Sequence, residues 1–140
     1  MTELSLNDDH FCFVCGSNNP DGLRLTFQYP APGTCRAEFT PPRKFQGWQG
    51  ILHGGIVSTL LDEALAHAAG GAERGGGGSG AVTAEITVRF KRPVPIGQMV
   101  LLEGRVISDK GRVVECESFL KDSDGNELAT AKGKLVRPRA

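Results

Sequence analysis

One stretch of the sequence decides the fold: residues 53–69 read HGGIVSTLLDEALAHAA. Apolar residues recur there at spacings of three and four, the period of an α-helix with a wide apolar face. Its start lies near Gly54-Gly55 and its stop at Gly70-Gly71, where the left-handed conformation open to glycine can end a helix. We therefore predict one long helix. Its apolar positions are Ile56, Val57, Leu60, Leu61, Ala64, Leu65 and Ala68.

The sequence on either side of this helix predicts strands. Apolar and polar residues alternate over residues 23–29 and again over 35–39, which is the pattern of half-buried strands. After the helix the strand pattern returns in four segments separated by turn-forming residues that suit hairpins. These segments are 82–90, 99–107, 113–120 and 128–136.

A helix this apolar has to be covered. We therefore predict an α+β fold in which one curved antiparallel sheet wraps around the helix. Residues 1–22 form a turn-rich lead-in, and residues 23–140 form a single domain. The remaining sheet face or edge would be buried by a second subunit, and a homodimer with twofold symmetry is the natural expectation.

Composition limits the partners of the protein. The 140 residues include 16 Lys plus Arg and 16 Asp plus Glu, so the chain lacks the basic excess of a nucleic-acid binder or a membrane-surface protein. It also lacks an apolar run long enough to span a membrane and a basic-then-apolar signal segment, which predicts a cytoplasmic protein. The glycine-rich residues 70–80 have too little side chain to pack and predict a mobile loop.

The start of the predicted helix is a candidate oxyanion site. The first amides of a helix have no internal partner, and the helix dipole adds partial positive charge there. His53-Gly54-Gly55 stands at this start, and glycine lets a ligand approach the backbone. A tight entry into a buried helix explains the two glycines equally well.

A pair of carboxylates, Asp62 and Glu63, lies further along the same helix. At 100° per residue, Asp62 falls beside the apolar stripe, on a flank that also carries the small residues Ala66, Ala69 and Gly70. Small side chains on this flank would let another segment or a ligand lie close to the helix. A solvated surface carboxylate is the alternative.

The cysteines give only half of a zinc motif. Cys12 and Cys15 have the spacing of zinc ligands, His10 is a possible third ligand, and Cys35 or Cys116 would have to be a distant fourth. Packed thiols in a turn explain the pair as well. We assign no metal and no cofactor from the sequence.

Taken together, these residues resemble a known family. Residues 52–64, LHGGIVSTLLDEA, are similar to the signature of hotdog-fold acyl-CoA thioesterases of the phenylacetate-pathway type, within the 4-hydroxybenzoyl-CoA thioesterase superfamily. The order of strands, helix and strands over 23–137 is also similar, and CFVCGSNNPDGL at 12–23 resembles the opening of one branch of the family. The resemblance implies a hotdog fold, a dimer or dimer of dimers, and hydrolysis of an acyl-CoA thioester to free acid and thiol.

The resemblance also implies roles for individual residues. Asp62 matches the helix carboxylate that acts as general base on water or as nucleophile, and Gly54 matches the amide that polarises the thioester carbonyl. Thr83 falls where relatives have a Ser or Thr that helps to hold the water or the carboxylate, and we expect it to come from the partner subunit. His53 is expected to orient the loop.

Substrate contacts are assigned on the same basis. Relatives often place an Asn several residues before His-Gly-Gly, where this chain has Gln49 as the candidate replacement. Gly55 would allow close approach of the substrate, and Arg89 and Lys91, with Arg92, are candidates for the CoA phosphates.

Two other functions remain open at this stage. A noncatalytic acyl-CoA or lipid-binding protein is favoured by the missing Asn, and would bind CoA esters without turnover. A hydratase or dehydratase would use His53 and Asp62 on either side of an acyl chain. Fold similarity alone does not separate these functions.

Overall fold

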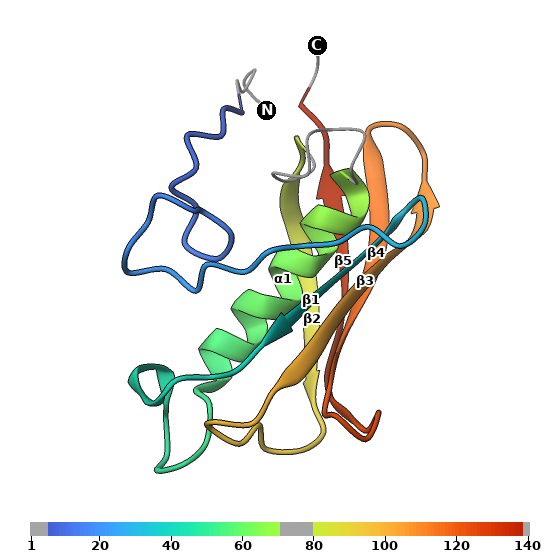
Figure 1. The fold of residues 1–140 in the computed structure, drawn as a ribbon. Coiled ribbons are helices and arrows are strands. Elements are labelled where there is room, and N and C mark those ends of the chain that lie inside the picture. Colours follow the sequence, from blue (N-terminus) through green and yellow to red (C-terminus); the bar gives the residue numbers. More distant parts are fainter. Residues whose placement is uncertain (1–5, 71–79, 139–140) are drawn as a thin grey trace.

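A single helix packs against one face of a five-stranded antiparallel sheet in the computed structural model, which describes residues 6–70 and 80–138 (Figure 1). The strand order is β1-β3-β4-β5-β2, with every neighbouring pair antiparallel. The predicted helix and the α+β class are confirmed. The elements are β1 (Thr34–Phe39), a 3₁₀ turn (Arg43–Phe45), α1 (Gly54–Gly70), β2 (Val82–Phe90), β3 (Val100–Asp109), β4 (Val113–Lys121) and β5 (Glu127–Val136).

The strand expected over residues 23–29 is wrong. Only an isolated bridge between Gln28 and Arg36 connects this segment to β1. The Leu25 amide instead donates to the Val14 carbonyl (2.9 Å), and Arg24 has a φ of 59°, which interrupts an extended chain. The alternation correctly marked Leu25 as buried, but the backbone there pairs with the N-terminal segment.

The helix lies unusually close to the centre of the sheet because small residues face it. A Cβ at Gly104 would overlap the Ala64 carbonyl oxygen. The Cys35 thiol donates to that same oxygen (3.1 Å), and the Ser118 hydroxyl donates to the Leu61 carbonyl (2.9 Å). Two helix carbonyls therefore gain partners from the sheet, and the backbones sit too close for a larger side chain.

The two faces of the sheet differ in character. The face toward α1 supplies fully buried side chains such as Leu102, Leu120 and Leu135. The opposite face carries ion pairs, Arg105 with Glu117 and Lys121 with Glu103. That face is compatible with water, so it does not need a second subunit to cover it.

The edge strand β2 is different, because its apolar side chains are exposed: Val82 is 40 %, Ile86 36 % and Phe90 57 % exposed. Among residues 6–70 and 80–138, β5 is the only strand that pairs with β2. An unpaired strand edge is a template for association, so the predicted subunit contact has a candidate location, although the contact itself stays a prediction.

The loop expected over residues 70–80 falls on 71–79, outside the described residues. Within 6–70 and 80–138, no helix combines the length and apolarity that crossing a membrane requires.

Candidate active site

The start of α1 carries an amide that is open to a ligand. Among the described residues, the Gly54 N–H has no acceptor, whereas the Gly55 N–H donates to Nδ1 of His53 (2.8 Å). The His53 amide in turn donates to the Phe45 carbonyl (3.0 Å). Because Nδ1 of His53 accepts, the neutral ring carries its proton on Nε2. His53 therefore bonds both to the start of α1 and to the loop before it, and its loop-orienting role stays a prediction.

An open groove of about 860 Å³ runs beside this helix start. His53 and Gly54 line it together with two exposed aromatic side chains, Trp48 at 84 % and Phe90 at 57 % exposure. Aromatic walls next to an open helix N-terminus suit a ligand with an apolar part and a carbonyl. Sequence reasoning missed both aromatic residues as site candidates.

The candidate substrate-binding residues divide between the groove and other surfaces. Lys91 and Arg92 line the groove, whereas Gln49, Gly55 and Arg89 are not among its lining residues. The Lys91 ammonium pairs with Glu127 (2.6 Å), and this hydrogen bond lowers the pKa of the Glu127 carboxyl. A phosphate reaching Lys91 would compete with that carboxylate.

Asp62 makes a specific contact with the edge strand. The Thr83 hydroxyl donates to Oδ1 of Asp62 at 2.7 Å. A register irregularity in β2 follows directly, between Thr83 and Glu85, and such bulges commonly re-aim a side chain. Asp62 is half-buried, neither in the apolar core nor freely solvated.

The expectation that Thr83 reaches Asp62 from a partner subunit is wrong for this contact, which forms within one chain. The reason is the sheet order. β2 is the edge strand next to β5 and lies along the flank of α1 that carries Asp62, so both groups come from the same subunit.

Asp62 and the Gly54 amide of one chain lie far apart. They are separated by eight residues of α1 (62 − 54), which corresponds to roughly 12 Å of helix rise and about 80° of rotation. A reacting carbonyl needs both an attacking group and an oxyanion donor within about 3 Å of its atoms. The two groups of one chain are therefore badly placed to act on a single thioester.

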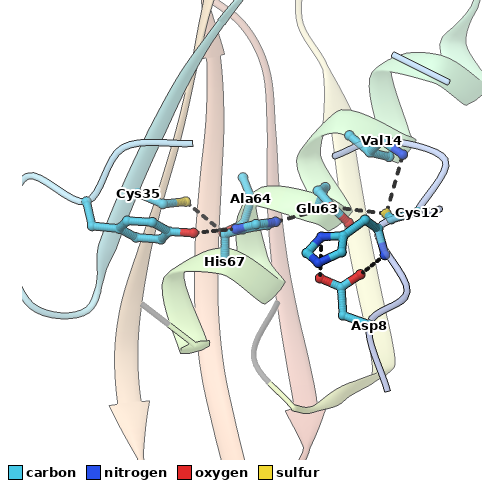
Figure 2. Close-up of polar contacts among 9 residues, drawn as sticks. Asp8, Cys12, Val14, Cys35, Glu63, Ala64 and His67 are labelled. Carbon is cyan, nitrogen blue, oxygen red and sulfur yellow. Dashed lines mark hydrogen bonds and ion pairs between the residues drawn. The ribbon is translucent and has the colours of Figure 1, made fainter. Parts of the chain in front are cut away.

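Glu63 points away from Asp62, toward the N-terminal segment. Its Oε2 lies 3.2 Å from Nε2 of His67 and accepts from the Cys12 thiol at 3.4 Å (Figure 2). Burial acts against ionisation here, but the hydrogen bonds from His67, Cys15 and Cys12 outweigh it and lower the pKa of Glu63. Burial and the nearby Glu63 raise the pKa of the Cys15 thiol.

This contact corrects the possible zinc ligands named from the sequence. Cys12 and Cys15 gather with Glu63, their candidate ligand atoms all within 4.8 Å of one another. His10 is exposed and faces Asp8 (3.9 Å), and Cys35 bonds to a helix carbonyl instead. The spacing of Cys12 and Cys15 was a local signal for two members of the cluster, whereas no local pattern in the sequence indicated that Glu63 joins them.

Comparisons with known proteins agree on one family. Residues 49–129 match the model of the thioesterase superfamily. The acyl-coenzyme A thioesterase THEM4 of Bos taurus is 37 % identical over 93 residues, which cover 66 % of this chain and 36 % of that protein. This chain therefore spans little more than a third of that relative's length.

Solved structures show the same architecture. A crystal structure of the thioesterase superfamily protein RHA08564 superimposes with a TM-score of 0.80 at 27 % identity, covering 91 % of this chain and 60 % of the other. The E. coli PaaI protein from the phenylacetic acid degradation operon gives a TM-score of 0.71 at 21 % identity, covering 82 % and 84 %.

Proposed function

The chain belongs to the thioesterase superfamily, and from that premise we propose that it hydrolyses an acyl-CoA thioester to a free acid and the CoA thiol. Its helix-on-sheet architecture is the hotdog fold of that family, as expected from the sequence. The observation that carries the proposal is the half-buried Asp62 carboxylate on α1, held at 2.7 Å by the Thr83 hydroxyl.

In the proposed reaction, Asp62 acts as general base. Its carboxylate takes a proton from a water molecule, whose oxygen attacks the thioester carbonyl carbon. Thr83 occupies Oδ1, which fixes the orientation of the carboxylate and leaves Oδ2 for the water. General-base assistance of this kind is worth roughly 10² to 10⁴ in rate.

The Gly54 amide stabilises the negative charge that develops on the carbonyl oxygen. Its N–H has no acceptor among the described residues, and the helix dipole adds to its effect. One such donor contributes about 10² to 10³ in rate. Collapse of the tetrahedral intermediate then expels the thiolate of CoA.

The proposed active site combines two copies of the chain. Asp62 of one copy is separated from the Gly54 amide of the same copy by roughly 12 Å along α1, so the start of α1 from a second copy completes the site. The exposed apolar side chains of edge strand β2, Val82, Ile86 and Phe90, are the proposed contact surface. A C2 dimer would then hold two equivalent sites.

Binding of the CoA phosphates is proposed at two cations that line the groove. Lys91 and Arg92 are among its lining residues and would pair with phosphate oxygens. The aromatic side chains of Trp48 and Phe90 would contact apolar parts of the substrate.

The test is a thiol-release assay with short, medium, long-chain and aryl CoA esters, run on the wild type and Asp62→Asn. We expect the wild type to release thiol and the variant to lose roughly 10² to 10⁴ in kcat/KM. Asp124→Asn is the matched control, because Asp124 is exposed in the turn between β4 and β5, and its activity should equal the wild type.

Three outcomes would contradict the proposal. Undiminished turnover by a folded Asp62→Asn variant would remove Asp62 from the mechanism. Tight CoA-ester binding without turnover by the wild type would identify a binding protein. Loss of enoyl-thioester absorbance without free thiol would identify a hydratase.

A further inference from the structure

A cluster of potential metal ligands lies on the side of α1 that faces the N-terminal segment. The Cys12 and Cys15 thiols and the Glu63 carboxylate place one ligand atom each within 4.8 Å of the others. All three side chains are half-buried. They come from two segments about 50 residues apart in the sequence, so the fold itself brings them together. Figure 2 shows Cys12 of the N-terminal segment beside Glu63 of α1.

The backbone around the two cysteines forms a tight loop that presents both sulfurs. The Gly16 amide donates to the Cys12 carbonyl (2.9 Å), and a Cβ at Gly16 would overlap the backbone of Cys12, so only glycine fits. The Val14 amide donates to the Cys12 sulfur (3.4 Å). This hydrogen bond fixes the position of the Cys12 sulfur beside Glu63.

The carboxylate is held in place by residues behind it. Nε2 of His67 lies 3.2 Å from Oε2 of Glu63, and Nδ1 of His67 lies 2.8 Å from the Tyr29 hydroxyl. His67 is only 2 % exposed, and its ring stacks on Phe27 at a centroid distance of 3.9 Å. Metal ligands commonly have such a second layer of hydrogen bonds that fixes their orientation.

We propose that Cys12, Cys15 and Glu63 bind one zinc ion. Two thiolates and one carboxylate suit zinc, which accepts sulfur and oxygen together and prefers tetrahedral geometry. The Cys12 sulfur lies 3.4 Å from the Glu63 oxygen, close to the roughly 3.6 Å separation of a sulfur and an oxygen on one tetrahedral zinc. A water molecule takes the fourth position.

The ion ties the N-terminal segment to the helix and takes no part in hydrolysis. Asp62 bonds to Thr83 on another flank of α1 and is not a member of the cluster. The position of Glu63 also favours metal over a redox pair of cysteines, because a disulfide between Cys12 and Cys15 would have no use for an oriented carboxylate.

The test measures zinc on the purified intact chain, with thiols kept reduced and weakly bound metal removed by dialysis. We expect one equivalent of zinc per chain by elemental analysis, and thiolate-to-metal absorption after replacement by Co²⁺. Cys12→Ser and Cys15→Ser should lose the metal and the absorption band. Glu63→Gln should keep the band and weaken zinc binding at least tenfold.

Cys35→Ser is the matched control, because Cys35 donates to the Ala64 carbonyl and is not a member of the cluster, and serine retains a donor. It should keep one equivalent of zinc. At free zinc about 100 times Kd, the wild-type Tm should rise by roughly 8 °C, and that of Cys12→Ser should not.

Two results would overturn the proposal. One is a wild-type chain with four free thiols that binds neither Zn²⁺ nor Co²⁺. The other is undiminished zinc in the Cys12→Ser and Cys15→Ser variants. Since the wild type is measured directly, a variant that fails to fold does not prevent a decision.

Discussion

Replacing Thr83 by valine tests how Asp62 is held. Valine keeps the β-branched shape that suits strand β2 and removes only the hydroxyl that donates to Asp62 at 2.7 Å. A hydrogen bond to a charged group contributes about 1.5 to 3 kcal/mol. If the transition state depends fully on this bond, kcat/KM falls roughly 10- to 150-fold, and the half-buried position of Thr83 favours the lower end.

The thiol-release assay should be run as a double-mutant cycle. In the Asp62→Asn background the base is already absent, so adding Thr83→Val should change kcat/KM less than twofold. Thr87→Val is the matched control: Thr87 lies on the same strand and is exposed, so its kcat/KM should equal the wild type. Thermal unfolding of each variant separates loss of activity from loss of fold.

Two results would refute this reasoning. If Thr83→Val is as active as the wild type, the bond seen in the structure does not serve catalysis. If Thr83→Val lowers kcat/KM by the same factor in the wild-type background and in the Asp62→Asn background, Thr83 acts independently of the carboxylate.

The remaining predictions concern packing and assembly. Gly104→Ala should lower the free energy of unfolding by about 1 to 3 kcal/mol in a urea titration, because its methyl group would overlap the Ala64 carbonyl; an unchanged midpoint would contradict the close helix–sheet contact. Ile86→Arg places a charge on the exposed edge of β2, and should yield monomers by light scattering together with loss of thiol release. Dimers that remain active would show that this edge is not the interface.

The sequence predicted most elements because their patterns are local. Helix α1 begins and ends within one residue of the expected bounds, since its apolar period is regular and glycines flank it. The segment 23–29 shows the limit of such patterns. Alternation reports which side chains are buried, as for Leu25, but it does not report what the backbone pairs with, and here the partner is Val14.

The candidate site was likewise only partly predictable from the sequence. Asp62 and Gly54 stand out from their spacing in one helix; the structure bonds Asp62 to Thr83 and gives the Gly54 amide no acceptor among the described residues, and their catalytic roles stay predictions. The subunit that supplies Thr83 could not be predicted, because it depends on where β2 falls in the sheet order. The contact of Glu63 with Cys12 joins distant parts of the chain and has no local signal.

Asp62 and Glu63 contact different parts of the fold because consecutive residues of a helix point about 100° apart. That rotation directs Asp62 to Thr83 on β2 and Glu63 to Cys12 in the N-terminal segment. The two acidic residues are thus adjacent in sequence but bonded to different parts of the fold. Anchoring the N-terminal segment through Glu63 holds the helix from one side, while the contact with β2 fixes the carboxylate proposed as base. Substitutions at 62 and 63 should therefore separate turnover from metal binding, although only one peptide bond lies between them.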